Sequence, residues 1–203
     1  SPMPRAASSS SPGEIPATVI ASDRRCGSVK SWSYSALKTF EKCPYETYLK
    51  SVQKIPQESS EALDRGNRIH DLCEQYVDGT LDELPPELAK MSRRFIELKQ
   101  EYEKGKVILE EEWAYTSDWD TTEWRSKDAW LRLKLDAMLM ESETSATVID
   151  YKTGKKFGNE LKHAEQLMLY AIVSFLRYPA LEFIEVTNWY TDHNETLTRS
   201  YTR

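Results

Sequence analysis

Two charged residues in the segment Val148–Gly154 have the types and spacing needed for chemistry on a phosphate. The segment reads Val-Ile-Asp-Tyr-Lys-Thr-Gly, which is typical of a strand. Alternate residues of a strand share a face, so we expect Asp150 and Lys152 on one face and Tyr151 on the other. A second carboxylate at the same place would complete a divalent-metal site with a neighbouring cation. Such a site suits phosphodiester cleavage.

Asp136 is the candidate for the second carboxylate. Strand-like residues on both sides of the polar stretch 140–145 predict a hairpin centred near Glu143. Asp136 and Asp150 lie at equal distances from that centre, so they should face each other across neighbouring antiparallel strands, with Cβ atoms about 5 Å apart. Two carboxylates this close repel each other, and a bound cation is the usual resolution.

The periodicity of the apolar residues predicts the elements that position this hairpin. Helical spacing occurs in 34–49 (broken at Cys43-Pro44), 60–77, 86–104 and 160–178. Strand-like composition occurs in 107–115, 124–140, 146–151 and from Phe183 onward, where His193-Asn194 turns the last hairpin. This order predicts an α/β fold with a mixed central sheet of about five strands flanked by helices.

The composition sets the size and class of the protein. The chain has 203 residues, 39% of them hydrophobic, which is enough for a single domain over 31–203 after a flexible segment over 1–30. A net charge of −6 argues against a protein that coats nucleic acid through bulk charge, but it does not exclude DNA as a substrate.

The cysteines and the hydropathy bear on the compartment. Cys26, Cys43 and Cys73 are odd in number and widely spaced, which favours a reducing environment over a disulfide framework. The sequence has no run of about 18 apolar residues. We therefore expect a soluble intracellular protein, located in the cytoplasm (of a host cell if the protein is viral), with no membrane partner.

The two strands of the hairpin resemble a known nuclease core. Leu133–Ala137 and Val148–Gly154 are similar to the core of the PD-(D/E)XK nuclease superfamily, and specifically to its RecB-like exonuclease branch. The resemblance implies a restriction-endonuclease-like core with N-terminal helical additions. Alone, the pattern Asp150-x-Lys152 is more often a solvated strand face, so the assignment depends on further matches.

Three further stretches supply those matches. Arg65–His70 resembles the upstream helix motif of the branch, which ends in a metal-binding histidine. Gln166–Tyr170 is similar to its Gln-x-x-x-Tyr motif, and 33–49 resembles its N-terminal helix. The resemblance extends over about residues 31–190, and the order of the motifs carries most of its weight.

Carried over by position, the resemblance implies a set of roles. The metal ligands would be His70, Asp136, Asp150 and the main-chain carbonyl of Tyr151, for Mg²⁺ or Mn²⁺. Lys152 would be the catalytic lysine, while Gln166 and Tyr170, on one helical face, would position the lysine or the DNA strand.

One departure from the branch concerns its cysteines. Some relatives hold an iron–sulfur cluster with four cysteines, one in the Cys-Pro motif and three after the catalytic core. Cys43 matches the first, but no cysteine follows Cys73, so no iron–sulfur cluster is expected within these residues. The sequence has no helicase motif either, so a helicase or recombination partner would be a separate protein.

Several residues are candidates for contact with DNA. Arg65 lies in the histidine motif, and Lys155 and Lys156 either hold the phosphate backbone or form an ordinary solvated turn. Trp119 and Trp124 are the best candidates for stacking on unpaired bases, because they flank an expected exposed loop. Residues 110–112 form an acidic cluster that reads as a solvated edge, although one of them could support the metal.

These features predict a divalent-metal-dependent DNA nuclease. An exonuclease acting on DNA with a free end, in DNA repair, recombination or phage DNA processing, is the leading hypothesis. A structure-specific or sequence-specific endonuclease with the same core is one alternative. A nuclease-like subunit that binds DNA without cutting it is the other.

Overall fold

The computed structural model describes residues 29–203. The expected flexible segment over 1–30 falls almost wholly outside the described residues, as does Cys26. Within the described part, no helix has the length and apolar character needed to cross a bilayer.

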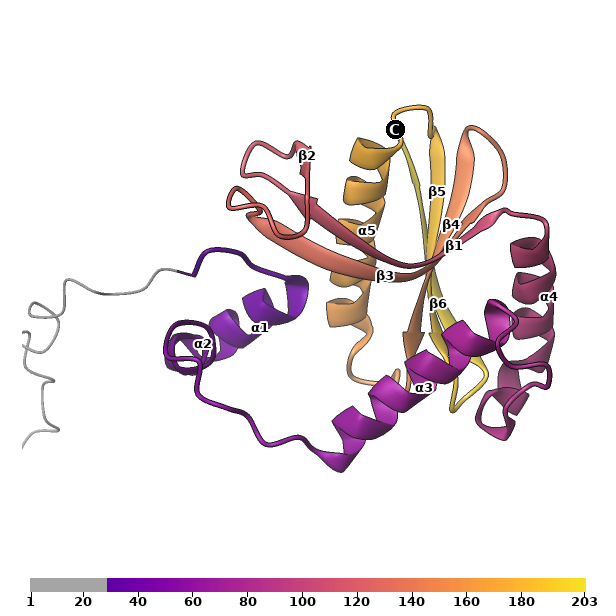
Figure 1. The fold of residues 1–203 in the computed structure, drawn as a ribbon, viewed down its shortest axis with the longest axis horizontal. Coiled ribbons are helices and arrows are strands. Elements are labelled where there is room, and N and C mark those ends of the chain that lie inside the picture. The colour runs from indigo at the N-terminus through magenta and orange to yellow at the C-terminus, as the bar shows by residue number, and fades with distance from the viewer. Residues whose placement is uncertain (1–28) are drawn as a thin grey trace, which may run out of the picture.

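A six-stranded mixed sheet forms the centre of the fold (Figure 1). The strands are β1 (Val107–Tyr115), β2 (Thr121–Thr122), β3 (Leu131–Met140), β4 (Ser145–Lys152), β5 (Phe183–Tyr190) and β6 (Glu195–Thr202). Their order is β2-β1-β3-β4-β5-β6, and β4 with β5 is the one parallel pair of this sheet. A parallel pair needs a crossover, and the helix between β4 and β5 supplies it.

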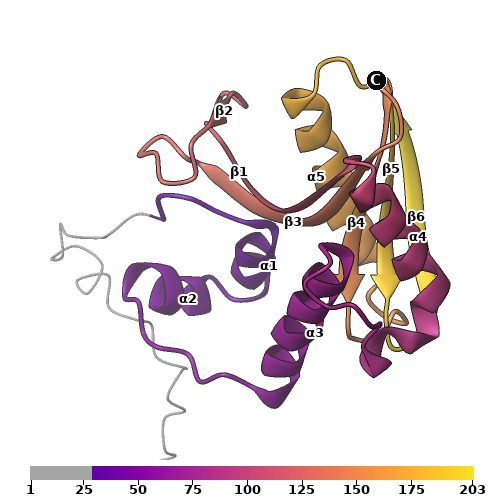
Figure 2. The ribbon, with the colours of Figure 1, turned by 45° about the vertical axis from the view of Figure 1, so that its right-hand side comes forward.

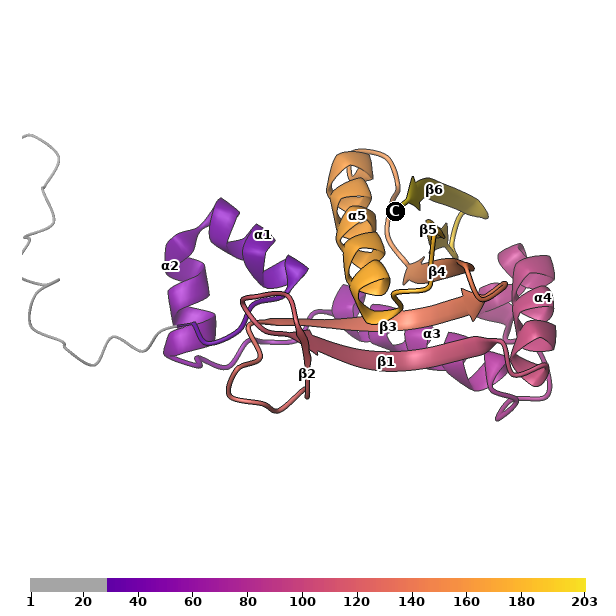
Figure 3. The ribbon, with the colours of Figure 1, turned by 90° about the horizontal axis from the view of Figure 1, so that it is seen from above.

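Helices cover both faces of the sheet. They are α1 (Tyr34–Lys42), α2 (Pro44–Thr47), α3 (Glu61–Val77), α4 (Ser92–Glu103) and α5 (Glu160–Arg177), with a π-helical turn over Tyr48–Val52 and a 3₁₀ helix over Pro86–Met91. Figure 3 shows α5 on one face, with α3 and α4 on the other. Two apolar cores correspond to these faces, one packed on α5 and one on α3 and α4. The predicted α/β class with helices on a mixed sheet is confirmed.

The N-terminal helices lie beside the main layers. Figures 1 and 2 show α1 and α2 under the protruding ends of β1 and β3. Tyr34 of α1 donates a hydrogen bond to the Lys162 carbonyl (2.6 Å), and Lys38 pairs with Glu165 (2.5 Å). These contacts fix α1 against the first turns of α5.

The structure differs from the sequence expectations in three places. The two-residue strand β2 brings the number of strands to six rather than five. The third strand begins at Leu131 and not at 124, because Ser126 ends the strand pattern: its hydroxyl accepts the Asp128 N–H, which stabilises a turn. The helix expected over 86–104 starts as a 3₁₀ helix and becomes α-helical at Ser92.

Partway along β1 and β3, the buried apolar residues change from one face of the sheet to the other. Leu135 packs in the core under α5, whereas Ala137, two residues later, packs in the core under α3 and α4. Glu110, at the same level of β1, has a positive φ of 50°. The β1–β3 ladder pairs Leu109 with Ala137 and then Glu111 with Leu135. Glu110 and Asp136, which lie between these pairs, are not paired with each other in the ladder. Asp136 therefore lies where the strand changes faces and can approach elements on both sides of the sheet.

Candidate metal centre and lysine site

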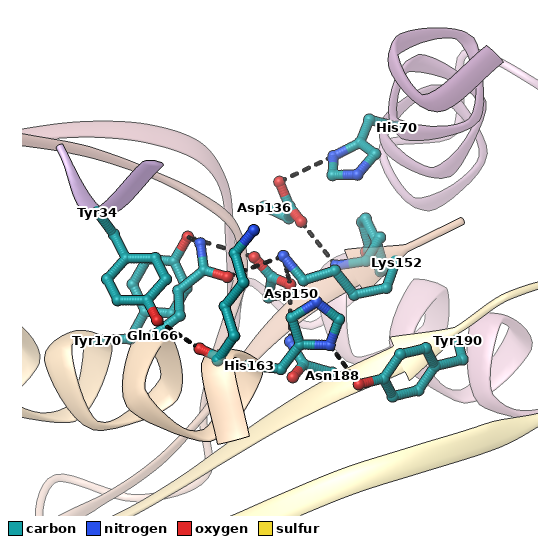
Figure 4. A network of polar contacts seen from close by, with 12 residues as sticks. Tyr34, His70, Asp136, Asp150, Lys152, His163, Gln166, Tyr170, Asn188 and Tyr190 are labelled. Atoms are coloured by element: carbon teal, nitrogen blue, oxygen red, sulfur yellow. Dashed lines mark hydrogen bonds and ion pairs between the residues drawn. The ribbon is translucent and has the colours of Figure 1, made fainter. Parts of the chain in front are cut away.

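The Asp136 carboxylate connects α3 to β4 (Figure 4). Its Oδ1 lies 3.1 Å from His70 Nδ1, and its Oδ2 accepts the Tyr151 N–H at 2.7 Å. Ile69 and Cys73 on α3 are fully buried, so they fix the rotation of the helix and direct His70 toward the sheet. The imidazole and the carboxylate thus converge as the histidine motif predicts.

The register of the β3–β4 hairpin agrees with the sequence expectation. Its last ladder pair is Ala137 with Ile149, and continuing that register by one residue sets Asp136 opposite Asp150. The Asp136 side chain takes the next main-chain donor, the Tyr151 N–H. Because the N–H and C=O of one strand residue lie on the same edge, the Tyr151 carbonyl also faces Asp136.

Asp150 has a different set of partners from Asp136. Its carboxylate accepts hydrogen bonds from Asn188 Nδ2 at 2.7 Å and Tyr170 Oη at 3.2 Å, and it forms an ion pair with Lys152 Nζ at 2.7 Å. Asp150 is 5% exposed. Three donors therefore compensate the cost of burying this charge.

Lys152 lies on the face of β4 that meets α5. Its Nζ donates to Gln166 Oε1 at 2.9 Å, and Gln166 Nε2 donates to Tyr170 Oη at 3.2 Å. The Tyr151 ring lies on the opposite face, between Phe95 and Trp189. Lys152, Gln166, Tyr170 and Asp150 form one connected polar network in Figure 4.

Burial and charge perturb the titration of the central groups. Burial raises the pKa of Asp136, and the nearby Asp150 charge raises it further. Hydrogen bonds from His70 and the Tyr151 N–H lower it, but the net shift is upward. Burial works to lower the pKa of His70, but the hydrogen bond and charge of Asp136 outweigh it, so the net shift is upward. Burial and the neighbouring carboxylates also raise the pKa of Tyr170, which keeps its hydroxyl protonated and able to donate.

His70, Glu110 and Asp136 form the group of side chains best placed to hold a metal ion. Their ligand atoms all lie within 4.8 Å of one another. One imidazole nitrogen and two carboxylate oxygens suit Mn²⁺ or Mg²⁺ by ligand type. Asp150 lies outside this group, so of the sequence-predicted ligands the structure brings together His70 and Asp136 and adds Glu110.

Glu110 is a ligand candidate for which the sequence pattern favours a solvated edge, although it allows one residue of 110–112 to support the metal. In a regular strand, residues 110–112 alternate faces, and that alternation favours a solvated edge. Instead, the left-handed backbone at Glu110, which costs a non-glycine residue on the order of 1–3 kcal/mol, turns its carboxylate toward His70 and Asp136. The same carboxylate pairs with Lys134. Strain of this kind concentrates at functional sites.

Asn188 is a residue that sequence reasoning missed. It is fully buried on β5, opposite Asp150 in the parallel ladder, and its amide orients that carboxylate. The signal in the sequence is a polar residue inside the otherwise strand-like stretch 183–190. No residue near Asn188 in the sequence indicates that its partner is Asp150, because α5 separates the two strands in the chain.

The structure separates the residues expected to contact DNA. Trp124 lines a cavity that reaches Gln166, whereas Trp119 packs edge-on against Trp130 at a centroid distance of 5.8 Å. The Arg65 guanidinium forms a bidentate ion pair with the Asp192 carboxylate, with N–O distances of 2.6 and 2.9 Å.

Lys155 and Lys156 line a different hollow from the one that holds the metal ligand candidates. The two lysines share that hollow with Phe157, Glu160 and His193, and Lys156 lies 3.4 Å from Glu195. Their role as contacts to the phosphate backbone stays a prediction.

We expect the substitution Glu110→Gln to weaken Mn²⁺ binding at least about 10-fold, because it removes one of the negative charges of the ligand group. Isothermal titration calorimetry on the purified protein measures this. Glu112→Gln is the matched control: the side chain is exposed on the same strand, and its affinity for Mn²⁺ should match that of the unmodified protein. Equal affinities for all three proteins would exclude Glu110 from the site.

The fold and these residues define a class: an α/β protein with a histidine–carboxylate group beside a buried aspartate and lysine. The family model for the PD-(D/E)XK nuclease superfamily matches residues 31–175. The chain belongs to the PD-(D/E)XK nuclease superfamily, whose nucleases use divalent metals.

Other comparisons add little. A search of curated proteins finds no match to this chain. A solved structure titled "Crystal structure of SSO0001" is similar at 12% sequence identity and a TM-score of 0.38, covering 86% of this chain and 68% of the other. A likeness at this level carries no argument about activity.

Proposed function

We propose that this protein is a divalent-metal-dependent DNA nuclease of the RecB-like branch, and that it acts as an exonuclease on DNA with a free end. The observation that carries the proposal is the meeting of two groups at one place: the His70, Glu110 and Asp136 group, and the Asp150, Lys152 pair. The proposed setting is DNA repair, recombination or phage DNA processing inside the cell, alongside a separate helicase or recombination protein.

The residues have separable tasks in this proposal. His70, Glu110 and Asp136 would hold Mg²⁺ or Mn²⁺, with Asp150 and the Tyr151 carbonyl adjacent. When bound, the ion polarises the phosphoryl oxygen and makes a water more acidic. Lys152 would stabilise negative charge that develops on a phosphate bound beside it.

The surrounding side chains keep Lys152 and Asp150 in place. Gln166 Oε1 accepts from the ammonium group of Lys152 and holds it beside Asp150. Tyr170 and Asn188 donate to the two oxygens of Asp150, so that carboxylate cannot rotate freely. Such fixed groups reduce the reorganisation that the reaction requires.

Digestion of end-labelled DNA tests the proposal. The substrates are 5′-labelled and 3′-labelled linear strands, linear duplexes and closed circular single-stranded DNA, each incubated with Mg²⁺, Mn²⁺ or a chelator. An exonuclease degrades the linear substrates only with a metal and leaves the circle intact. Asp150→Ala protein, purified in parallel, controls for contaminating nucleases and should be inactive.

Each alternative has its own result in this assay. Cleavage of the circle would identify an endonuclease with the same core. Binding of DNA without turnover under any divalent metal would identify a non-cleaving subunit. Full metal-dependent activity in the Asp150→Ala protein would refute the proposed site itself.

A further inference from the structure

A cavity of about 470 Å³ lies between the start of α1, β3 and α5. Cavities of about 300–1,000 Å³ are the usual size for small organic groups. We call it the Trp124 pocket, and the residues that matter for its chemistry are Trp32, Tyr34, Trp124, Arg132, Gln166 and Tyr170. The predicted active-site roles leave Trp32 and Arg132 without a task.

The Trp124 pocket adjoins the candidate active site on two sides. Gln166 and Tyr170 belong to its wall and also hold Lys152 and Asp150 through hydrogen bonds. Lys134 lines both this pocket and the hollow that contains His70 and Asp136. A group bound in the pocket would therefore be a direct neighbour of a phosphate held between Asp136 and Lys152.

The walls of the pocket combine aromatic surface with positive charge. The Arg132 guanidinium lies 5.7 Å from the centre of the Trp124 ring and donates to Ser31 Oγ at 3.2 Å. Arg132 Nε and Trp32 Nε1 are buried and donate no hydrogen bond to any residue from 29 to 203. Buried donors without partners are costly, and a polar group arriving in the pocket could satisfy them after a small adjustment.

Glu165, an acidic side chain close to this wall, is compensated. Glu165 accepts a hydrogen bond from Tyr34 Oη at 3.0 Å and pairs with Lys38 at 2.5 Å. Its negative charge is therefore already matched by α1. Lys134 is already paired with Glu110, whereas Arg132 pairs with no acid among residues 29–203, so Arg132 is the cation of this wall that can attract a phosphate next to a bound nucleotide.

We propose that the Trp124 pocket binds one unpaired base of the DNA strand, immediately beside the phosphate that is cleaved. A flat ring with polar edges matches an aromatic wall with buried N–H donors, and base stacking on tryptophan is tolerant of sequence. A base within a duplex is stacked and paired on all sides, so it cannot enter. The substrate is then single-stranded DNA or a frayed end, a conclusion that rests on the proposed nuclease function.

Abasic oligonucleotides test this proposal through binding alone. Fluorescently labelled single strands, each with one abasic nucleotide at a different position, are titrated with protein in Ca²⁺, which replaces Mn²⁺ to suppress cleavage. We expect one position to weaken binding about 5-fold to 150-fold, the range for losing one stacked base. Trp124→Ala should weaken binding of the intact strand by the same factor, and the abasic position should then have no further effect.

Two variants complete the test. Trp124→Phe keeps an aromatic face and should restore most of the affinity and the sensitivity to the abasic position. Phe183→Ala, which removes an exposed ring at the start of β5, should behave as the unmodified protein. Mn²⁺ affinity should be the same in all four proteins, which separates loss of the pocket from loss of the fold.

The possible outcomes distinguish this inference from the nuclease proposal. Equal binding of every abasic strand, or an unchanged affinity in Trp124→Ala, overturns the pocket even if DNA is cleaved. Position-dependent binding in a protein that never cleaves DNA supports the pocket and refutes the nuclease. Failure of the protein to bind any single strand refutes the pocket as well.

Discussion

Asp136→Asn is expected to abolish metal-dependent DNA cleavage and to weaken Mn²⁺ binding at least about 100-fold. The carboxylate lies within the ligand group formed with His70 and Glu110, and a unit charge about 4 Å from another is worth about 4 kcal/mol at an effective dielectric constant near 20. The amide keeps the shape and can still accept the Tyr151 N–H, so the change is confined to charge. Calorimetric titration with Mn²⁺ measures the loss.

Thermal unfolding supplies a second measurement for Asp136→Asn. Mn²⁺ should raise the midpoint temperature of the unmodified protein, because a ligand that binds only the folded state stabilises it, and the variant should lose this effect. Without metal, the variant should be at least as stable, because burial already raises the pKa of the Asp136 carboxyl and disfavours its charge.

The control for Asp136→Asn is Asp82→Asn, the same change at an exposed position in the loop before α4. Its Mn²⁺ affinity and its unfolding temperature with and without Mn²⁺ should match those of the unmodified protein. An Asp136→Asn protein that still binds Mn²⁺ with unchanged affinity would remove Asp136 from the metal site.

The parts of the fold that follow local patterns could be predicted from the sequence. The strand-like composition of β3 and β4 and the polar turn between them predict the hairpin register, and that register sets Asp136 opposite Asp150. Likewise, a spacing of four residues places Gln166 and Tyr170 on one face of α5, where they meet each other. These relations depend on neighbours in the chain or on simple periodicity.

The features that the sequence could not predict, or could predict only as a less favoured alternative, depend on exceptional backbone conformations or on contacts between residues far apart in the chain. The Glu110 carboxylate lies close to His70 and Asp136 only because φ at Glu110 is positive, and no residue pattern predicts such strain within a strand. Asn188 meets Asp150 through a parallel pairing that a whole helix separates in sequence. Both cases are decided by tertiary structure rather than by propensity.

The tryptophans illustrate a third limit. The sequence predicts Trp119 and Trp124 as the candidates for base stacking, because the first lies in an expected exposed loop and the second follows it. In the structure, Trp119 packs against Trp130, whereas Trp124 faces Arg132 in a cavity beside Gln166. Trp119 is the more exposed of the two rings, so what distinguishes Trp124 is its place in the cavity wall beside Gln166, which composition cannot show.

Lys152→Met is expected to reduce DNA cleavage by at least about 100-fold while Mn²⁺ binding stays intact or becomes tighter. The methionine side chain has a similar length but no charge, so stabilisation of the negative charge that develops on the phosphate is lost. The ammonium group lies 2.7 Å from Asp150 Oδ2, close to the ligand group. Removing a positive charge beside a cation site favours the cation. Cleavage rates under single-turnover conditions and calorimetry with Mn²⁺ measure the two effects separately.

The opposite effects of Lys152→Met and Asp136→Asn on metal affinity make the assignment testable as a pair. If Asp136 is a ligand and Lys152 acts on the phosphate, the first variant loses cleavage alone and the second loses cleavage and metal together. Lys104→Met, which removes an exposed lysine at the end of α4, should change neither quantity. A Lys152→Met protein with unchanged cleavage would show that the ammonium group has no part in the reaction. A Lys152→Met protein that no longer binds Mn²⁺ would assign Lys152 a structural role. Removing its positive charge favours the cation, so only a loss of the site's geometry could abolish binding.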